Sequence, residues 1–178
     1  MTDLNPIIAD RFTEHLEVFG KTMEHMDTIQ EIAYRCKAAL ENGNKILFCG
    51  NGGSAADSQH LAAELICRFK KERRSLAGIA LTTDTSALTA IANDYDFESV
   101  FARQVEGLGR TGDVLIGIST SGNSKNVVKA AEMARSIGMH TIAFTGEGGG
   151  KLGELCDITL AIPSNVTCLL YTSDAADD

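Results

Sequence analysis

The chain has 178 residues, of which 44% are hydrophobic, and this suits one domain with a sizeable core. Its net charge of −8 disfavours a nucleic acid or an anionic membrane as the main partner, and no apolar run is long enough to span a bilayer. The N-terminus does not resemble a signal peptide and the five cysteines form no CxxC pair, so we expect a cytoplasmic protein with reduced thiols.

Two amphipathic helices are predicted at the start of the chain, over residues 4–19 and from Thr22 to Glu41. Apolar residues recur at helical spacing in both, and Asn42-Gly43-Asn44 ends the second helix. A βαβ unit does not need two leading helices. Their surplus apolar surface therefore favours packing against another subunit.

Strands and helices alternate over the rest of the chain. Short apolar runs predict five strands, at Lys45–Cys49, Ala77–Leu81, Asp113–Ile118, Thr141–Thr145 and Ile158–Ile162. Helical spacing predicts four helices between them, at Ser54–Phe69, Thr85–Asn93, Phe97–Glu106 and Ser124–Gly138. This order indicates an α/β fold, a three-layer αβα sandwich around a mostly parallel five-stranded sheet. Ligands of such folds bind at the carboxyl ends of the strands.

The stretch from Lys45 to Arg68 combines a candidate anion site with a polar helix face. The turn Gly50-Asn51-Gly52-Gly53 follows a strand, and Ser54 begins a helical pattern, which is an arrangement that directs backbone N–H groups at an anion. Four polar residues then share one helix face because they are three or four positions apart: Asp57, His60, Glu64 and Arg68. Together these features favour an active site.

A second candidate anion site is the loop Ser119-Thr120-Ser121-Gly122-Asn123-Ser124, which lies between a predicted strand and a predicted helix. Its hydroxyls and backbone donors suit a phosphate, although an ordinary Ser/Thr-rich turn with an N-cap is the commoner explanation of such a loop taken alone. Two such loops on one sheet favour the phosphate cradle. We interpret Gly146–Gly150 as a permissive turn. Neither a G-x-G-x-x-G fingerprint nor a Walker lysine is present, which disfavours dinucleotides and nucleoside triphosphates.

His60 and Glu64 have three possible roles. They are four positions apart and offer two ligands to a zinc ion, which is one fewer than a catalytic zinc site needs. The Glu64 carboxylate is alternatively a general base. On spacing alone, a hydrogen-bonded pair on a helix surface is the commoner outcome.

Three segments, GNGGSAADSQHLAAEL, LTTDTSALTAIANDY and GISTSGNSKNV, closely resemble the phosphoheptose isomerases of the SIS (sugar isomerase) superfamily. The resemblance extends to about Thr167 and implies an SIS domain over residues 1–167. It implies an intramolecular oxidoreductase that converts D-sedoheptulose 7-phosphate to D-glycero-D-manno-heptose 7-phosphate, the first step of heptose synthesis for bacterial lipopolysaccharide. It also implies a homotetramer with active sites at subunit contacts.

The resemblance also implies roles for individual residues. The substrate-binding set comprises Asn51, Gly52, Gly53, Ser54, Glu64, Asn93, Asp94, Ser119, Thr120, Ser121 and Ser124, with the phosphate in the hydroxyl loop. His60 and Glu64 match two ligands of one zinc ion per subunit, and Glu64 also matches the catalytic carboxylate. Glu64 is the natural base for moving a proton through an enediol, but a bound metal would lower its basicity. The sequence leaves open whether Glu64 is ligand, base or both.

The sequence departs from this family after Pro163-Ser164-Asn165-Val166-Thr167. The family continues with a long helix whose glutamine and histidine complete the zinc site, whereas residues 168–178, CLLYTSDAADD, contain neither residue. This tail resembles a translated sequencing adapter. We favour a non-native read-through tail over a divergent natural one, and we expect the last helix to be missing, zinc binding to be weak and isomerisation to be impaired.

A different class of function also fits an SIS domain. It is a non-catalytic module that binds a sugar phosphate or, as one relative of these isomerases does, the replication initiator DnaA. The combination of His60 with Glu64 favours the enzyme.

Overall fold

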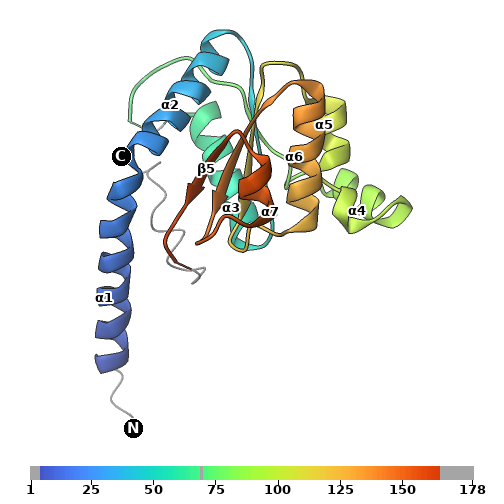
Figure 1. Cartoon of the computed structure of the whole chain (residues 1–178). Coiled ribbons are helices and arrows are strands. Elements are labelled where there is room, and N and C mark those ends of the chain that lie inside the picture. The colour runs from blue at the N-terminus through green and yellow to red at the C-terminus, as the bar shows by residue number, and fades with distance from the viewer. Residues whose placement is uncertain (1–4, 69, 165–178) are drawn as a thin grey trace.

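The computed structural model describes residues 5–68 and 70–164, so the tail expected at residues 168–178 lies outside the described residues (Figure 1). One sheet has the strand order β2-β1-β3-β4-β5, and every pairing in it is parallel. Its strands are β1 (Ile46–Gly50), β2 (Gly78–Ala80), β3 (Val114–Ser119), β4 (His140–Thr145) and β5 (Ile158–Ala161). The predicted strands and their parallel arrangement are confirmed.

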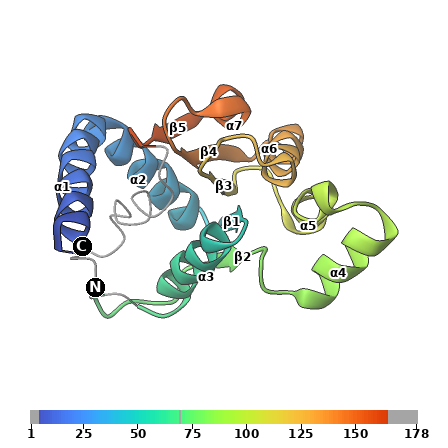
Figure 2. The same ribbon diagram turned by 90° about the horizontal axis from the view of Figure 1, so that it is seen from below.

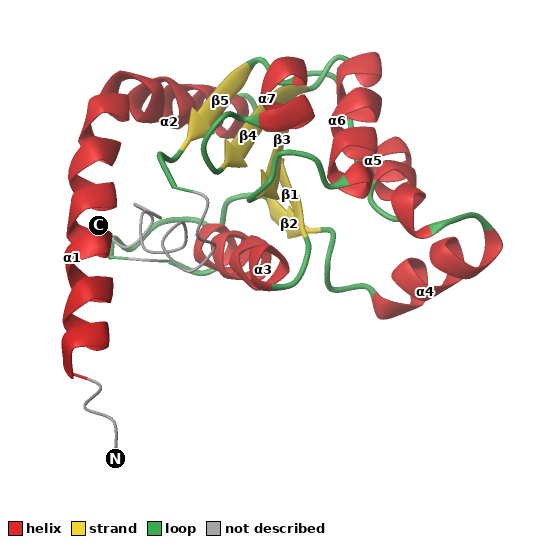
Figure 3. Cartoon of the chain, turned by 60° about the horizontal axis from the view of Figure 1, so that its bottom comes forward, coloured by secondary structure: helices red, strands yellow, loops and turns green. Residues whose placement is uncertain are grey.

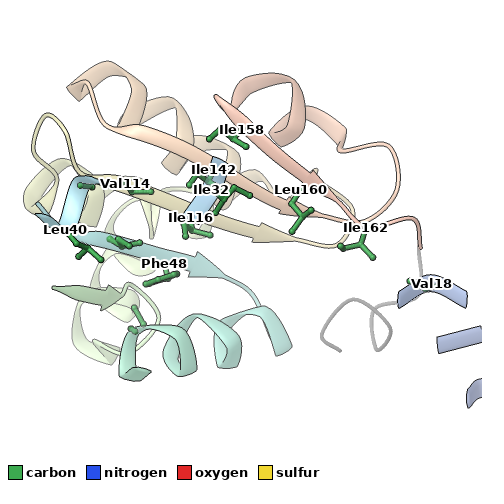
Figure 4. Close-up of a cluster of buried hydrophobic side chains, with 14 residues drawn as sticks. Val18, Ile32, Leu40, Phe48, Val114, Ile116, Ile142, Ile158, Leu160 and Ile162 are labelled. Carbon is green, nitrogen blue, oxygen red and sulfur yellow. The ribbon is translucent and has the colours of Figure 1, made fainter. Parts of the chain in front are cut away.

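One face of the sheet is covered by α2 (Met26–Glu41) and α3 (Gly53–Ile66). Figure 4 shows Phe48, Val114, Ile116 and Ile142 of the strands packed in one cluster with Ile32 of α2. Successive side chains of a strand point to opposite faces, so the alternate strand residues contribute to the other layer.

The opposite face is covered by α5 (Ala102–Leu108), α6 (Lys125–Ile137) and α7 (Gly150–Leu155). Leu47 and Leu115 of the strands pack there against Val127 of α6 and Leu152 of α7. Helices on both faces of the sheet confirm the three-layer sandwich. The sequence did not predict α7, because glycine is among the weakest helix formers and this helix begins within a glycine run.

The helix predicted over Phe97–Glu106 is divided into η2 (Phe97–Ser99) and α5. Between them, Val100 and Phe101 are almost completely buried in the second core cluster. Burial of these two neighbouring apolar side chains outweighs the local preference for one continuous helix.

The first helix, α1 (Asn5–Thr22), extends away from the sheet and is joined to α2 by η1 (Met23–His25) (Figures 1 and 3). Six large apolar side chains of α1 and η1 are between 49% and 67% exposed: Ile7, Ile8, Phe12, Leu16, Phe19 and Met23. The predicted surplus of apolar surface is confirmed. An exposed patch of this kind marks an interaction surface.

The sequence also predicts that no segment spans a bilayer and that the cysteines are reduced. No described helix has the length and hydropathy needed to cross a bilayer. The four cysteines within the described residues are free thiols: Cys36, Cys49, Cys67 and Cys156.

Candidate active site

The turn between β1 and α3 forms the first wall of the candidate site. Gly52 is the N-cap of α3, with φ +57°, and it has no side chain to cap the first turn. No side chain caps this turn, and the N–H groups of Ala55 and Ala56 donate to the carbonyl of Gly52 at 3.1 and 3.3 Å. The N-terminus of a helix begun in this way is suited to an anion. The turn is tight, because a Cβ added to Gly50 would lie 2.6 Å from the Cβ of Ser54. Ser54 itself is buried in the first turn of α3.

The loop between β3 and α6 forms the second wall. The hydroxyl of Ser119 donates to the hydroxyl of Ser124 at 2.9 Å, so the structure brings these two predicted phosphate-binding residues together. The backbone N–H of Gly122 donates to the carbonyl of Ser119 at 2.9 Å, which folds the loop back on itself. Ser121 is exposed and Thr120 is half-buried. The loop presents several hydroxyls at the carboxyl end of β3, as the sequence predicted.

The glycine loop after β4 is a permissive turn, with positive φ at Gly148, Gly149 and Gly150, and it also supports the hydroxyl loop. The N–H of Gly146 donates to the carbonyl of Thr120, and the N–H of Leu152 donates to the carbonyl of Gly122, both at 2.9 Å. A Cβ on Gly150 would lie 2.6 Å from the carbonyl oxygen of Ser121. Only glycine permits so close an approach of two backbones.

Replacing Gly122 with alanine should disrupt the contact between these two loops. Gly122 has φ +65°, and an added Cβ would lie 1.9 Å from the carbonyl oxygen of Gly149. We expect a loss of about 1–3 kcal/mol in the free energy of unfolding, measured in urea, and weaker binding of inorganic phosphate.

The matched control for this prediction is Gly148→Ala. Gly148 also has a positive φ, +85°, but an added Cβ meets nothing within 4 Å. The control therefore carries the backbone strain without the collision. Equal effects of the two substitutions on stability and on phosphate binding would contradict a supporting role for the second loop.

One buried hydroxyl lies at the same edge of the sheet. Thr145 ends β4, is the register partner of Ser119, and is 3% exposed. Its Oγ1 is the only buried side-chain polar atom within the described residues that has no hydrogen-bond partner. Because native proteins rarely leave such atoms unpaired, this position suits a bound water or a ligand atom.

A pair of amides joins the two walls. Asn51 Nδ2 donates to Asn126 Oδ1 at 2.9 Å, and Asn126 Nδ2 donates to Asn51 Oδ1 at 2.8 Å. Asn126 lies in the first turn of α6. Our reading of the sequence missed this residue, and the only local signal for it is its position two residues after the hydroxyl loop.

The polar face of α3 holds His60, which is exposed, and Glu64, which is half-buried. Their spacing of four positions places both on one side of the helix. Arg68 does not belong to this face, contrary to the prediction, because α3 ends at Ile66 and Cys67 leaves the helical conformation. Arg68 instead forms an ion pair with Glu72 at 2.6 Å.

The end of α3 is held by Arg73, another residue that the sequence analysis missed. Its guanidinium donates to the backbone carbonyls of Glu64 at 2.7 Å and Leu65 at 3.0 Å. A cation at this position satisfies carbonyls that lack partners within the helix and complements the helix dipole. Arg73 thereby stabilises the turn of α3 that carries Glu64.

Of the predicted zinc site, the described residues contain His60 and Glu64. Across residues 5–68 and 70–164, no group of three or more His, Cys, Asp and Glu side chains is placed to hold a metal. His60 and Glu64 have the imidazole and carboxylate donors that zinc accepts, but they are fewer than the three protein ligands of a catalytic site. Zinc binding stays a prediction.

Asn93 and Asp94 are exposed at the end of α4 (Thr85–Asp94), which projects from the body of the molecule (Figure 2). Asn93 Nδ2 donates to Asp94 Oδ1 at 2.8 Å. The chain that follows is attached to α6, because Glu98 forms ion pairs with Lys125 at 2.8 Å and Lys129 at 3.2 Å. Hydrogen bonds from Lys125 and Lys129 hold the pKa of the Glu98 carboxyl below its usual value. The roles of Asn93 and Asp94 in substrate binding stay predictions.

Comparison with known proteins agrees with this architecture. The SIS domain family matches residues 10–146. The phosphoheptose isomerase of Aliarcobacter butzleri is 60% identical over 161 residues, which cover 90% of this chain and 85% of that protein.

Two solved structures have the same fold over most of their length. Phosphoheptose isomerase GmhA from Neisseria gonorrhoeae has a TM-score of 0.90 at 45% identity, covering 96% of this chain and 91% of that one. The phosphoheptose isomerase from Francisella tularensis has a TM-score of 0.91 at 38% identity, covering 97% and 93%. The parallel sheet, the two loops at its carboxyl edge and these similarities lead to one conclusion: the chain belongs to the SIS domain family and, within it, to the phosphoheptose isomerases.

Proposed function

We propose that this protein converts D-sedoheptulose 7-phosphate to D-glycero-D-manno-heptose 7-phosphate. The observation that carries the proposal is that α3 begins at a turn suited to an anion and bears Glu64 on its polar face. At 1.5 Å per residue, Glu64 lies about 16 Å along the helix axis from Gly53. The ligand is expected to be anionic at the end bound by the turn and to extend along α3 toward the Glu64 side chain, which leans toward the N-terminus of the helix. An open-chain heptose 7-phosphate is elongated and carries its charge at one end.

The isomerisation moves a carbonyl group from C2 to C1. A base removes a proton from C1 to form an enediol, a proton is then delivered to C2, and the hydroxyl proton passes from O1 to O2. We assign the proton transfer between carbons to the Glu64 carboxylate. The phosphate is assigned to the first turn of α3 and to the hydroxyls of Ser119 and Ser124, which bind it through local dipoles.

The reaction is tested by incubating the protein with D-sedoheptulose 7-phosphate in D₂O and following the products by NMR. We expect the aldose to form at a reduced rate and to carry deuterium at C2. Binding of the substrate without turnover would instead support the non-catalytic sugar-phosphate module. Absence of both binding and turnover would overturn both functions.

We also propose that each subunit holds one zinc ion, with His60 and Glu64 as two of its ligands. A bound zinc ion supplies Lewis acidity that polarises the oxygens of the substrate. Further ligands must come from residues outside the described ranges or from another subunit, because the described residues form no larger group of ligands. Metal content measured by mass spectrometry should fall in His60→Ala, and an unchanged zinc stoichiometry would contradict the assignment.

We also propose that the protein is a cytoplasmic homotetramer and that it serves lipopolysaccharide heptose synthesis. The support for assembly is the exposed apolar face of α1, which does not pack on the sheet of its own chain. Light scattering should give the mass of four chains. The double substitution Phe12→Asp and Leu16→Asp should reduce that mass, because burying unpaired carboxylates in an apolar interface is costly. An unchanged mass in this variant would exclude α1 from the interface.

A further inference from the structure

We propose that Asn126 is a positioning residue, which holds the side chain of Asn51 in its binding orientation and couples the turn after β1 to the hydroxyl loop after β3. The inference rests on the proposed function and adds to it a residue that acts through Asn51. The two asparagines are 75 positions apart in the sequence, and they meet only because β1 and β3 are neighbours in the sheet.

The hydrogen bonds determine the orientation of both amides. Asn126 Oδ1 also accepts from the backbone N–H of Val127 at 3.0 Å. Because that N–H can only donate, the atom facing it must be the amide oxygen, and the direction of the Asn126 amide follows. Asn126 Nδ2 is then directed at Asn51 Oδ1, and Asn51 Nδ2 returns the bond. Aspartate has no donor and leucine has neither group, so no similar side chain reproduces both bonds.

The two partners differ in how firmly the fold holds them. Asn126 is 4% exposed and stands on α6, whose next residue, Val127, is fully buried in the core. Asn51 is half-buried and lies in the turn between Gly50 and Gly52, outside any helix or strand. Asn126 on α6 therefore restrains the side chain of Asn51 in the turn, rather than the reverse.

The pair leaves Asn51 able to bind a ligand. An asparagine amide has two N–H donors and two acceptor lone pairs, and the bond pair with Asn126 uses one of each. A ligand hydroxyl can use the others. We infer that Asn51 contacts the hydroxyls of the sugar, while the adjacent hydroxyl loop holds the phosphate.

The test is a double-mutant cycle with Asn51→Ala, Asn126→Ala and the double variant. Calorimetric titrations with D-sedoheptulose 7-phosphate and with inorganic phosphate give the affinities, and thermal unfolding checks that each variant is folded. Each single substitution should weaken sugar phosphate binding about tenfold, and the double variant should be no weaker than either single variant. Inorganic phosphate affinity should change far less. Asn126→Asp keeps one of the two bonds and should give an intermediate loss.

A purely structural role for Asn126 predicts a different pattern. Multiplicative losses in the double variant, equal losses for both ligands, or unchanged binding by Asn126→Ala would each overturn the inference. If Asn126→Ala does not fold, the same cycle is made with Asn126→Asp. Failure of the unsubstituted protein to bind the sugar phosphate would overturn the proposed function itself, and the two failures are therefore distinguishable.

Discussion

Replacing Glu64 with glutamine should lower kcat about 10³-fold, because a positioned general base contributes roughly two to four orders of magnitude and the amide cannot accept the proton. The protein should stay folded. Glu64 is half-buried, and its contact with Arg73 is made through the backbone carbonyl, which the substitution leaves intact. Steady-state kinetics with D-sedoheptulose 7-phosphate measure the effect.

The matched control is Glu132→Gln, which removes the same charge from an exposed position on α6 and should leave kcat unchanged. The zinc content of Glu64→Gln separates the two roles of the carboxylate. Lost activity with retained zinc identifies Glu64 as the base, whereas joint loss identifies it as a ligand. If Glu64→Gln kept a tenth or more of the parental turnover, another residue would have to be the base.

Replacing Asp113 with alanine should lower the free energy of unfolding by about 3 kcal/mol, because it removes the buried carboxylate of an ion pair whose Lys45 partner is only partly buried. The Asp113 side chain is 2% exposed and lies 2.5 Å from Lys45 Nζ. It also accepts bonds from the backbone N–H groups of Lys45 at 3.0 Å and Arg110 at 2.8 Å. These donors would lose their partner. Urea denaturation gives the free energies.

Asp113 precedes β3, at the end of the sheet opposite to the candidate site, so the effect should be on stability rather than on KM. Asp10→Ala on exposed α1 is the control for loss of a carboxylate and should be nearly neutral. Equal stabilities of the Asp113→Ala and Asp10→Ala variants would contradict the role given to the ion pair.

The same carboxylate should make stability depend on pH. Burial alone would raise the pKa of Asp113, but hydrogen bonds from Lys45, Asn44 and Arg110 hold it below its usual value. A carboxyl whose pKa is lower in the folded state stabilises the fold above the unfolded pKa of about 3.9, and loses that contribution as pH falls through the folded pKa. The stability difference between the parent and Asp113→Asn should therefore shrink in acid.

Much of the fold was predictable because its signals are local. Apolar runs such as Ile46–Cys49 mark buried strands, and strand–helix alternation implies a parallel sheet. The positions of the candidate loops followed from the same reasoning, since loops at the carboxyl ends of parallel strands gather at one edge. The spacing of His60 and Glu64 likewise placed them on one helix face.

The errors arose where distant residues decide the structure. Arg68 fits the helical spacing, yet α3 ends before it, and Arg73 binds the last carbonyls of that helix. The glycines after β4 predict a permissive turn, but their contact with the backbone of the hydroxyl loop is not visible in the sequence. Neither contact has a periodic signal in the chain.

The sequence by itself determined the layers of this protein, its two hydroxyl- and glycine-rich loops, and the pair of polar residues on α3. Periodicity and turn chemistry are properties of neighbouring residues, so they can be read from the chain alone. Only the tertiary structure decided that the Gly146–Gly150 loop supports the hydroxyl loop and that Asn126 is paired with Asn51. Those contacts depend on which strands are adjacent in the sheet, and adjacency is set by packing of the whole domain.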